Sequence, residues 1–259
     1  MLTIIRYGEI SLKGQNRSYF ENRLCNNIRT QTQCKVWKGR NRIYIGIDKD
    51  NLNKLNKVFG IVSYSPCIKA ELSYESIKEA IMNLGLDGHH DISFRITCQR
   101  LQKNFKPSRE IEKEIGSFVN VQFGFSVDLT NYDIEINIEI TDNAYIYIDK
   151  MKGLGGFPVG VAGEIGCKLD NEKILLSAFL LMKRGAKIVL IEGSEEGFIQ
   201  RLQSYTPYTL KNTFGNEYVA IASSDTLDNL NEEEGFVLRP LVGMDNNNIK
   251  QNLKQIGAQ

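Results

Sequence analysis

The residues with the clearest bearing on chemistry lie between a predicted strand and the helix that follows it. Hydrophobic spacing predicts the strand over residues 165–169 and the helix over 172–183. A phosphate-binding junction of this kind needs glycines, because they let backbone amides close on the anion. The junction here has no glycine and carries two carboxylates; it reads Asp170, Asn171, Glu172 and Lys173. We therefore predict a degenerate phosphate loop, with Asp170 or Asn171 capping the helix, and neither a catalytic residue nor a nucleotide cofactor.

The thiol nearest this junction is Cys167, and two roles are open to it. It could carry a persulfide, or it could be a core residue, since alternate residues of a buried strand face the core. We expect the core role, because no second cysteine lies near in sequence to resolve a mixed disulfide. The five cysteines include no Cys-x-x-Cys pair, and the His89-His90 pair has no third ligand nearby. Neither a disulfide framework nor a metal site is therefore predicted.

Positive charge is concentrated at the start of the chain. Residues 1–60 hold 12 Lys and Arg against 4 Asp and Glu, whereas the whole chain carries a formal net charge of +1. A basic module on an otherwise mildly acidic protein is typical of polyanion binding, because neutralising phosphates releases counterions. Charge alone is equally compatible with a solvated basic face.

The composition is that of an ordinary globular chain. With 259 residues, 42% of them hydrophobic, it can form one large domain or two to three small ones with real cores. No apolar run approaches the roughly 20 residues that span a bilayer, and the first residues do not form a signal peptide. We therefore expect no membrane partner and a cytoplasmic location.

The elements that must position these residues fall into three expected domains: 1–70, 71–160 and 161–259. The first domain has six predicted elements in the order βαββαβ, at 2–5, 16–30, 34–38, 42–47, 51–59 and 61–68. This order is that of a ferredoxin-like domain.

The second domain is predicted to hold two helices, one over 74–84 and one capped by Ser108, and a strand over 92–98. Strands at 134–140 and 144–148 form a predicted hairpin, whose alternation indicates a sheet with one solvent-exposed face. The third domain alternates short strands and helices, which predicts a small α/β layer with a parallel sheet. The chain as a whole is thus expected to be an α+β protein.

Three motifs follow one another along the chain. The first, within residues 6–20, contains Arg6-Tyr7-Gly8-Glu9-Ile10, Lys13-Gly14, Asn16-Arg17 and Phe20. The second is Gly155-Gly156-Phe157-Pro158-Val159-Gly160. The third combines Met182-Lys183-Arg184-Gly185 with Leu238-Arg239-Pro240-Leu241-Val242-Gly243-Met244-Asp245. In this order the motifs resemble those of the tRNA thiouridine synthetases, the tRNA sulfurtransferases that also feed sulfur into thiamine biosynthesis.

The resemblance implies a division of labour among the domains. In that family the ferredoxin-like domain and a THUMP domain bind the acceptor end of tRNA, and an ATP-pyrophosphatase domain activates a uridine for sulfur transfer. Residues 94–110 resemble the THUMP segment, although Gln99 stands where the family usually has an arginine. Glu9 is expected to orient Lys13 or Arg17. Eleven residues are expected to contact tRNA: Arg6, Tyr7, Lys13, Asn16, Arg17, Lys38, Arg40, Arg42, Arg100, Lys103 and Lys106.

The third domain departs from the family pattern at three places. The family's Ser-Gly-Gly-x-Asp-Ser phosphate loop is replaced by the junction at 170–173. A Gly-Glu-Ser turn that contacts the nucleotide should fall near residues 222–225, which read Ala-Ser-Ser-Asp. The chain also stops at Gln259, before further residues of the family. We therefore expect a truncated member with a degenerate ATP-pyrophosphatase domain.

Three functional hypotheses are open at this point. The first is a tRNA-binding or adaptor protein that presents tRNA to a separate catalytic subunit or sulfur carrier. The second is a divergent but active tRNA sulfurtransferase with a rebuilt site, using Cys167. The third is a homodimer scaffold in which the third domain serves only for association. The absence of a phosphate loop and of a paired cysteine favours the first hypothesis, in which the chain is not an enzyme and needs no cofactor.

Overall fold

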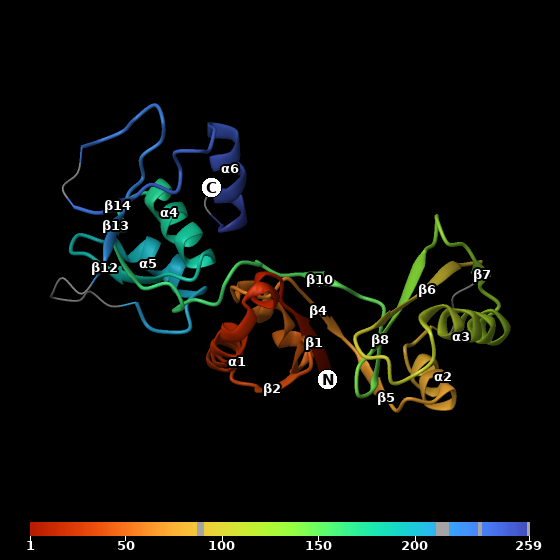
Figure 1. Ribbon diagram of the computed structural model, residues 1–259. Helices are drawn as coiled ribbons and strands as arrows, with labels where there is room; N and C mark the ends of the chain where they lie inside the picture. The colour runs from red at the N-terminus through yellow and green to blue at the C-terminus, as the bar shows by residue number, and fades with distance from the viewer. Residues whose placement is uncertain (87–90, 211–217, 233–234, 258–259) are drawn as a thin grey trace. The chain divides into compact units, whose positions relative to one another are not determined.

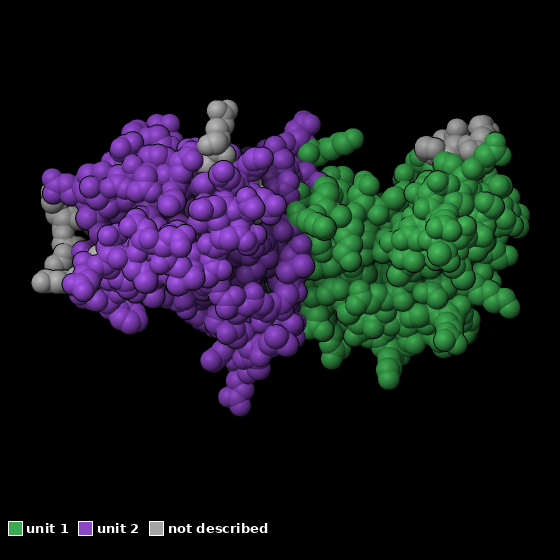
Figure 2. Space-filling view, turned by 90° about the horizontal axis from the view of Figure 1, so that it is seen from above, with its two compact units in different colours: residues 1–6, 35–49, 63–152 green, residues 7–34, 50–62, 153–259 purple. Residues whose placement is uncertain are grey.

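A computed structural model describes residues 1–86, 91–210, 218–232 and 235–257 of the chain (Figure 1). The chain divides into two compact units (Figure 2). The expected first domain contributes to both, so the predicted domain boundaries do not coincide with the units. Unit 1 comprises residues 1–6, 35–49 and 63–152, and unit 2 comprises residues 7–34, 50–62 and 153–259.

The first sheet of unit 1 has the strand order β10-β4-β1-β3-β2, and its neighbouring strands are antiparallel. Within it, the order β4-β1-β3-β2 gives the ferredoxin-like layout that the sequence predicts. The β2–β3 hairpin turns at Asn41, whose φ of 60° is one that asparagine tolerates. The strands are β1 (Leu2–Arg6), β2 (Lys35–Gly39), β3 (Arg42–Gly46), β4 (Ser63–Pro66) and β10 (Met151–Lys152).

The second sheet of unit 1 has the order β5-β9-β8-β6-β7, with β6 parallel to β7 and β8 and with β9 antiparallel to β5 and β8. Its core, which includes Phe94, Ile136 and Ile146, also contains residues of two helices. The predicted cap at Ser108 is wrong: Ser108 is the first residue of its helix, and Pro107 precedes it without a side-chain cap. The elements are β5 (Ile68–Ala70), α2 (Tyr74–Met82), β6 (Ser93–Arg100), α3 (Ser108–Phe123), β7 (Ser126–Val127), β8 (Ile134–Ile140) and β9 (Ala144–Tyr147).

The other face of this sheet is only partly exposed to solvent, which corrects the expectation from the alternating pattern. Asn137 and Glu139 lie on the polar face of β8, yet they are 8% and 1% exposed. Side chains from the first sheet of unit 1 cover this end of the face: Arg6 and Arg42 contact Glu139, and Tyr44 stacks on Tyr145 with ring centres 4.8 Å apart. Alternation separates polar from apolar positions, but it does not show what covers the polar side.

Unit 2 begins with two short 3-10 turns and a long helix. The predicted helix over 16–30 is α1 (Arg17–Thr32), preceded by η1 (Glu9–Leu12) and η2 (Gly14–Asn16). The short helix expected over 51–59 is the 3-10 helix η3 (Lys49–Lys57). Phe59, just after it, packs edge to face on Phe179 at 5.0 Å and so joins the unit 2 core.

The sheet of unit 2 is parallel throughout, as predicted, with the order β12-β11-β13-β14. Because β12 and β13 lie on opposite sides of β11, the direction in which strands are added reverses there. In open parallel sheets this reversal opens a crevice at the carboxyl ends of the strands, where ligands bind. The elements are β11 (Glu164–Cys167), α4 (Glu172–Lys183), β12 (Lys187–Leu190), α5 (Glu196–Gln203), β13 (Ala220–Ala222), β14 (Val237–Leu238) and α6 (Asn246–Gln255).

Candidate functional site

The first side of the crevice in unit 2 is the junction between β11 and α4. Asn171 caps α4, because its Oδ1 accepts a hydrogen bond of 3.0 Å from the amide of Ile174. The prediction that Asp170 or Asn171 caps this helix is therefore confirmed. The Asp170 carboxylate accepts from Asn171 Nδ2 at 2.8 Å and pairs with Lys168 at 3.1 Å. An anion at this helix start would meet a carboxylate and an amide already in use.

The second side of the crevice lies at the end of β13, within residues 222–225. Asp225 is 2% exposed and accepts hydrogen bonds of 2.9 Å from both Arg239 Nε and Asn231 Nδ2. Burial alone would raise the pKa of the Asp225 carboxyl, but these hydrogen bonds outweigh it and hold the pKa below its ordinary value. Ser177 of α4 donates to the carbonyl of Ser223 at 2.7 Å. This end of the crevice is therefore closed by contacts within the protein.

Cys167 lies on β11 and is fully buried in the unit 2 core, where the sequence places it. Burial, with a smaller contribution from the Asp170 charge, raises the pKa of its thiol to about 12. At neutral pH such a thiol stays protonated, and a protonated thiol is a poor nucleophile. All five cysteines are free thiols.

We expect Cys167 to be unreactive in the folded protein. Alkylation of the native chain with iodoacetamide at pH 8, followed by peptide mass spectrometry, should label the partly exposed Cys34 well before Cys167. Labelling of both should become equal in guanidinium chloride, which serves as the internal control. Rapid native labelling of Cys167 would contradict its assignment as a core thiol.

His89 and His90 lie outside the described residues. Across the part of the chain that the structure describes, there is no group of three His, Cys, Asp or Glu side chains that could hold a metal ion. In the same residues no helix is long and apolar enough to cross a membrane.

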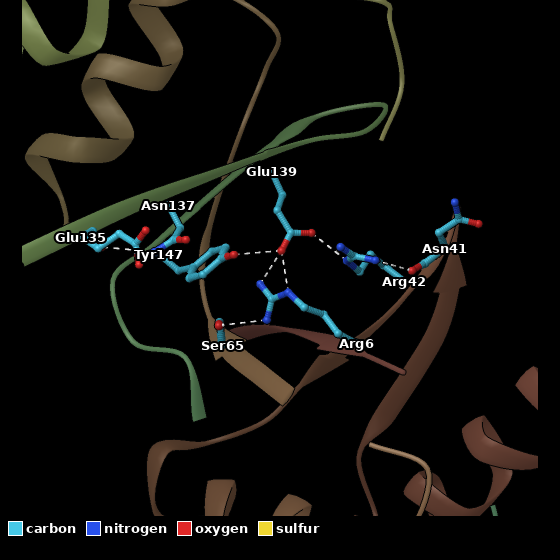
Figure 3. A network of polar contacts seen from close by, with 8 residues as sticks. All are labelled: Arg6, Asn41, Arg42, Ser65, Glu135, Asn137, Glu139 and Tyr147. Carbon is cyan, nitrogen blue, oxygen red and sulfur yellow. Dashed lines mark hydrogen bonds and ion pairs between the residues drawn. The ribbon is translucent and has the colours of Figure 1, made fainter. Parts of the chain in front are cut away.

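Two arginines expected to contact RNA instead meet a buried glutamate in unit 1 (Figure 3). Arg6 is 7% exposed, and its Nε donates to Glu139 Oε1 at 2.6 Å. Arg42 Nε donates to Glu139 Oε2 at 2.7 Å, and Tyr147 donates to Oε1 at 2.9 Å. Arg6 also donates to Ser65 Oγ at 3.1 Å. The charges of Arg6 and Arg42 are thus neutralised inside the protein, which corrects the expectation that they face the RNA.

Glu139 is held ionised by this network. Burial alone would raise the pKa of its carboxyl, but the charges of Arg6 and Arg42 and the hydrogen bonds from Arg42 and Tyr147 lower it below the ordinary value. One carboxylate therefore joins β1 and β3 of the first sheet to β8 and β9 of the second. No local signal in the sequence singles out Glu139, because its partners Arg6 and Arg42 are 133 and 97 residues away.

The remaining cations of unit 1 that the sequence singles out are exposed. We call Lys38, Arg40, Lys103 and Lys106 the unit 1 basic surface, since all four are open to solvent. Arg100 is half-buried and donates to the carbonyl of Phe105 at 3.1 Å, so it shapes the loop that carries the two lysines.

The Glu139 network brings the two halves of this surface to the same end of the molecule's first unit. Strand register pairs Gln99 with Glu139, so the carboxylate lies beside the end of β6. Arg42, at the start of β3, therefore draws the β2–β3 turn to the place where loop 101–107 begins. Asn104 of that loop donates to the carbonyl of Thr141 at 2.9 Å, which fixes the loop to the end of β8.

Unit 2 holds the other predicted RNA contacts. The Tyr7 hydroxyl donates to Glu21 at 2.5 Å and accepts from Arg17 Nη2 at 2.7 Å, so Tyr7 and Arg17 serve mainly to tie the first loop to α1. Burial, together with the hydrogen bond to Glu21, raises the pKa of Tyr7 to about 12. Asn16 and Lys13 are exposed.

Glu9 does not orient Lys13 or Arg17 as expected. Its carboxylate pairs with Arg184 at 3.2 Å, 175 residues away in sequence. Lys13 instead lies over the ring of Phe157, with Nζ 4.4 Å from its centre. These contacts bring residues of the first and third expected domains together within unit 2.

Comparison with known proteins agrees with this architecture. The family model described as the ThiI ferredoxin-like domain matches residues 2–65, and that of the THUMP domain matches residues 71–149. A probable tRNA sulfurtransferase of Methanobrevibacter smithii is 35% identical over 247 residues, which make up 84% of this chain and 64% of that protein. The chain spans about half to two thirds of the length of the curated relatives it matches.

Two solved structures share the fold. The crystal structure of PH1313 from Pyrococcus horikoshii is 30% identical, with a TM-score of 0.86 and 99% of both chains covered. A 4-thiouridine synthetase, solved with RNA and bound ATP, has a TM-score of 0.82 at 24% identity and covers 99% of this chain and 84% of that one. With its ThiI ferredoxin-like and THUMP domains and this homology, the chain belongs to the tRNA sulfurtransferase family.

Proposed function

We propose that the chain is a tRNA-binding protein of a tRNA thiolation system and does not itself activate RNA with ATP. The observation that carries the RNA-binding part is the unit 1 basic surface, whose four exposed cations come from both the ferredoxin-like and the THUMP segments. The Glu139 network spends its own two arginines in holding these segments together. Cations that remain exposed are the ones available to phosphates.

The state of the crevice supports the second part of the proposal. The start of α4 is capped by Asn171 and flanked by Asp170 and Glu172, so a triphosphate would have to displace a side-chain cap against two negative charges. On the opposite side, Arg239 is engaged by the buried Asp225. A separate catalytic subunit or sulfur carrier would then act on the bound tRNA. The cytoplasmic location and a homodimeric state stay predictions.

Filter binding of labelled tRNA across a salt series tests the RNA-binding part. We expect binding at micromolar protein or below, with an affinity that falls steeply as salt rises, because phosphate contacts supply most of the free energy. Binding that is undetectable at micromolar protein, or unchanged between low and high salt, would contradict the proposal.

Isothermal titration with Mg-ATP tests the second part. We expect no measurable heat of binding, for the reasons of charge and capping given above. The Asn171→Gly variant, which removes the cap, is a useful comparison, since binding by the variant alone would show that the cap blocks the site. A dissociation constant in the low micromolar range for the unmodified chain would favour the alternative that its homology to named tRNA sulfurtransferases suggests, a divergent but active enzyme.

A further inference from the structure

The motifs of the sequence meet at one corner of unit 2, away from the crevice. The amide of Phe157 donates to the carbonyl of Lys183 at 2.9 Å, so the glycine-rich motif lies against the end of α4. Gly156 has φ of 74°, and a Cβ there would come within 2.2 Å of the same carbonyl oxygen. Only a glycine allows this close approach without a shift of the backbone.

Arg184 ties the first motif to this corner. It pairs with Glu9 at 3.2 Å, and its guanidinium lies over the ring of Phe157 at 5.4 Å. Lys13 lies over the same ring at 4.4 Å. Two cations from segments about 170 residues apart thus share one aromatic ring.

A groove of about 520 Å³ opens at the same corner, between the end of α4 and the segment after β14. It is separate from the crevice, since it is lined by the last turn and a half of α4 rather than by the first turn. Arg239 at its rim is engaged by Asp225, whereas the Arg184 side chain is 65% exposed. Its apolar lining consists of Leu180, Leu181, Leu238, Pro240 and Met244, and its cations are Lys183, Arg184 and Arg239.

We propose that this groove binds an unpaired segment of the RNA. An unpaired base would lie on the apolar lining, while Lys183, Arg184 and the neighbouring Lys13 would contact the flanking phosphates. Charge complementarity favours an anionic strand, because the corner carries several cations and Glu9 is the one acidic residue that the described contacts place among them. This inference rests on the proposed function, and it gives the third domain a role in RNA binding that does not need the lost phosphate loop.

The test compares the double variant Lys183→Glu/Arg184→Glu with the matched control Lys250→Glu/Lys254→Glu, which reverses two exposed lysines on α6. Two probes are used: tRNA, and a blunt RNA duplex that lacks unpaired nucleotides. We expect the first variant to lose affinity for tRNA on the order of tenfold and to flatten the salt dependence by about 0.7 per lost single-strand contact. Its affinity for the duplex, and both affinities of the control, should stay near those of the unmodified chain.

Equal losses for tRNA and duplex, or equal losses in variant and control, would overturn the inference while leaving the proposed function intact. If the unmodified chain did not bind tRNA at all, the proposed function itself would fail. Photo-crosslinking of 5-bromouridine tRNA supplies a direct readout, in which crosslinked peptides should include the end of α4 or residues 238–244. A dimer that sedimentation shows to dissociate in the Lys183→Glu/Arg184→Glu variant would assign the groove to a second copy instead.

Discussion

The Glu139→Ala variant is expected to lose about 3–5 kcal/mol of unfolding free energy, the usual cost of leaving buried charges without their partner. Arg6 and Arg42 would both keep their charge in a site where their side chains are 9% and 11% exposed. The midpoint of urea unfolding, followed by circular dichroism, measures the loss. Folded variant protein should also bind tRNA more weakly, because the β2–β3 turn would no longer be held beside loop 101–107.

A triple variant separates charge from packing in this network. Replacing Arg6, Arg42 and Glu139 all by methionine removes the charges together, and such replacements are often neutral or stabilising. We therefore expect the triple variant to be more stable than Glu139→Ala. If it is equally unstable, the network contributes through shape rather than through charge.

The network also predicts how stability depends on pH. Because the pKa of Glu139 is lower in the folded than in the unfolded chain, its contribution is fully present above the ordinary glutamate value of about 4.3. That contribution is lost as the pH falls through the folded pKa. Acid unfolding of the Glu139→Gln variant should therefore depend less on pH below about 4.3 than that of the unmodified chain. An identical pH dependence would show that Glu139 does not titrate with unfolding.

Features set by neighbours in sequence could be predicted from the sequence. The cap of α4 depends on Asn171 and Ile174, three residues apart, and the parallel sheet of unit 2 follows from alternating short strands and helices. The burial of Cys167 follows in the same way from its place on a central strand.

Contacts between distant segments could not be predicted in this way. Arg6 lies in a basic motif, and only its contact with Glu139 shows that its charge is buried rather than exposed. Glu9 likewise stands near Lys13 and Arg17 in sequence, yet the fold offers it Arg184. Charge counting identifies a basic module, but it cannot separate cations that hold the fold from cations that face a ligand.

Reversing the unit 1 basic surface should have the largest effect on RNA binding. The variant replaces each of four exposed cations with glutamate: Lys38, Arg40, Lys103 and Lys106. Arg17 is left unchanged, since a glutamate there would face Glu21 and break the contact with Tyr7. We expect a loss of affinity on the order of a hundredfold at low salt and a flatter salt dependence, by about 0.9 for each phosphate contact removed.

The control for this variant must carry the same net charge, because a more acidic protein repels any polyanion. Exposed lysines outside the basic surface provide it, with glutamate placed at Lys54, Lys113, Lys250 and Lys254. Filter binding with several tRNA species should then show a uniform loss for the first variant, since phosphate contacts position the RNA without reading its sequence. An equal loss in the control would mean that net charge, and not the Glu139-held arrangement of cations, drives binding. A loss confined to one tRNA species would instead point to contacts with bases.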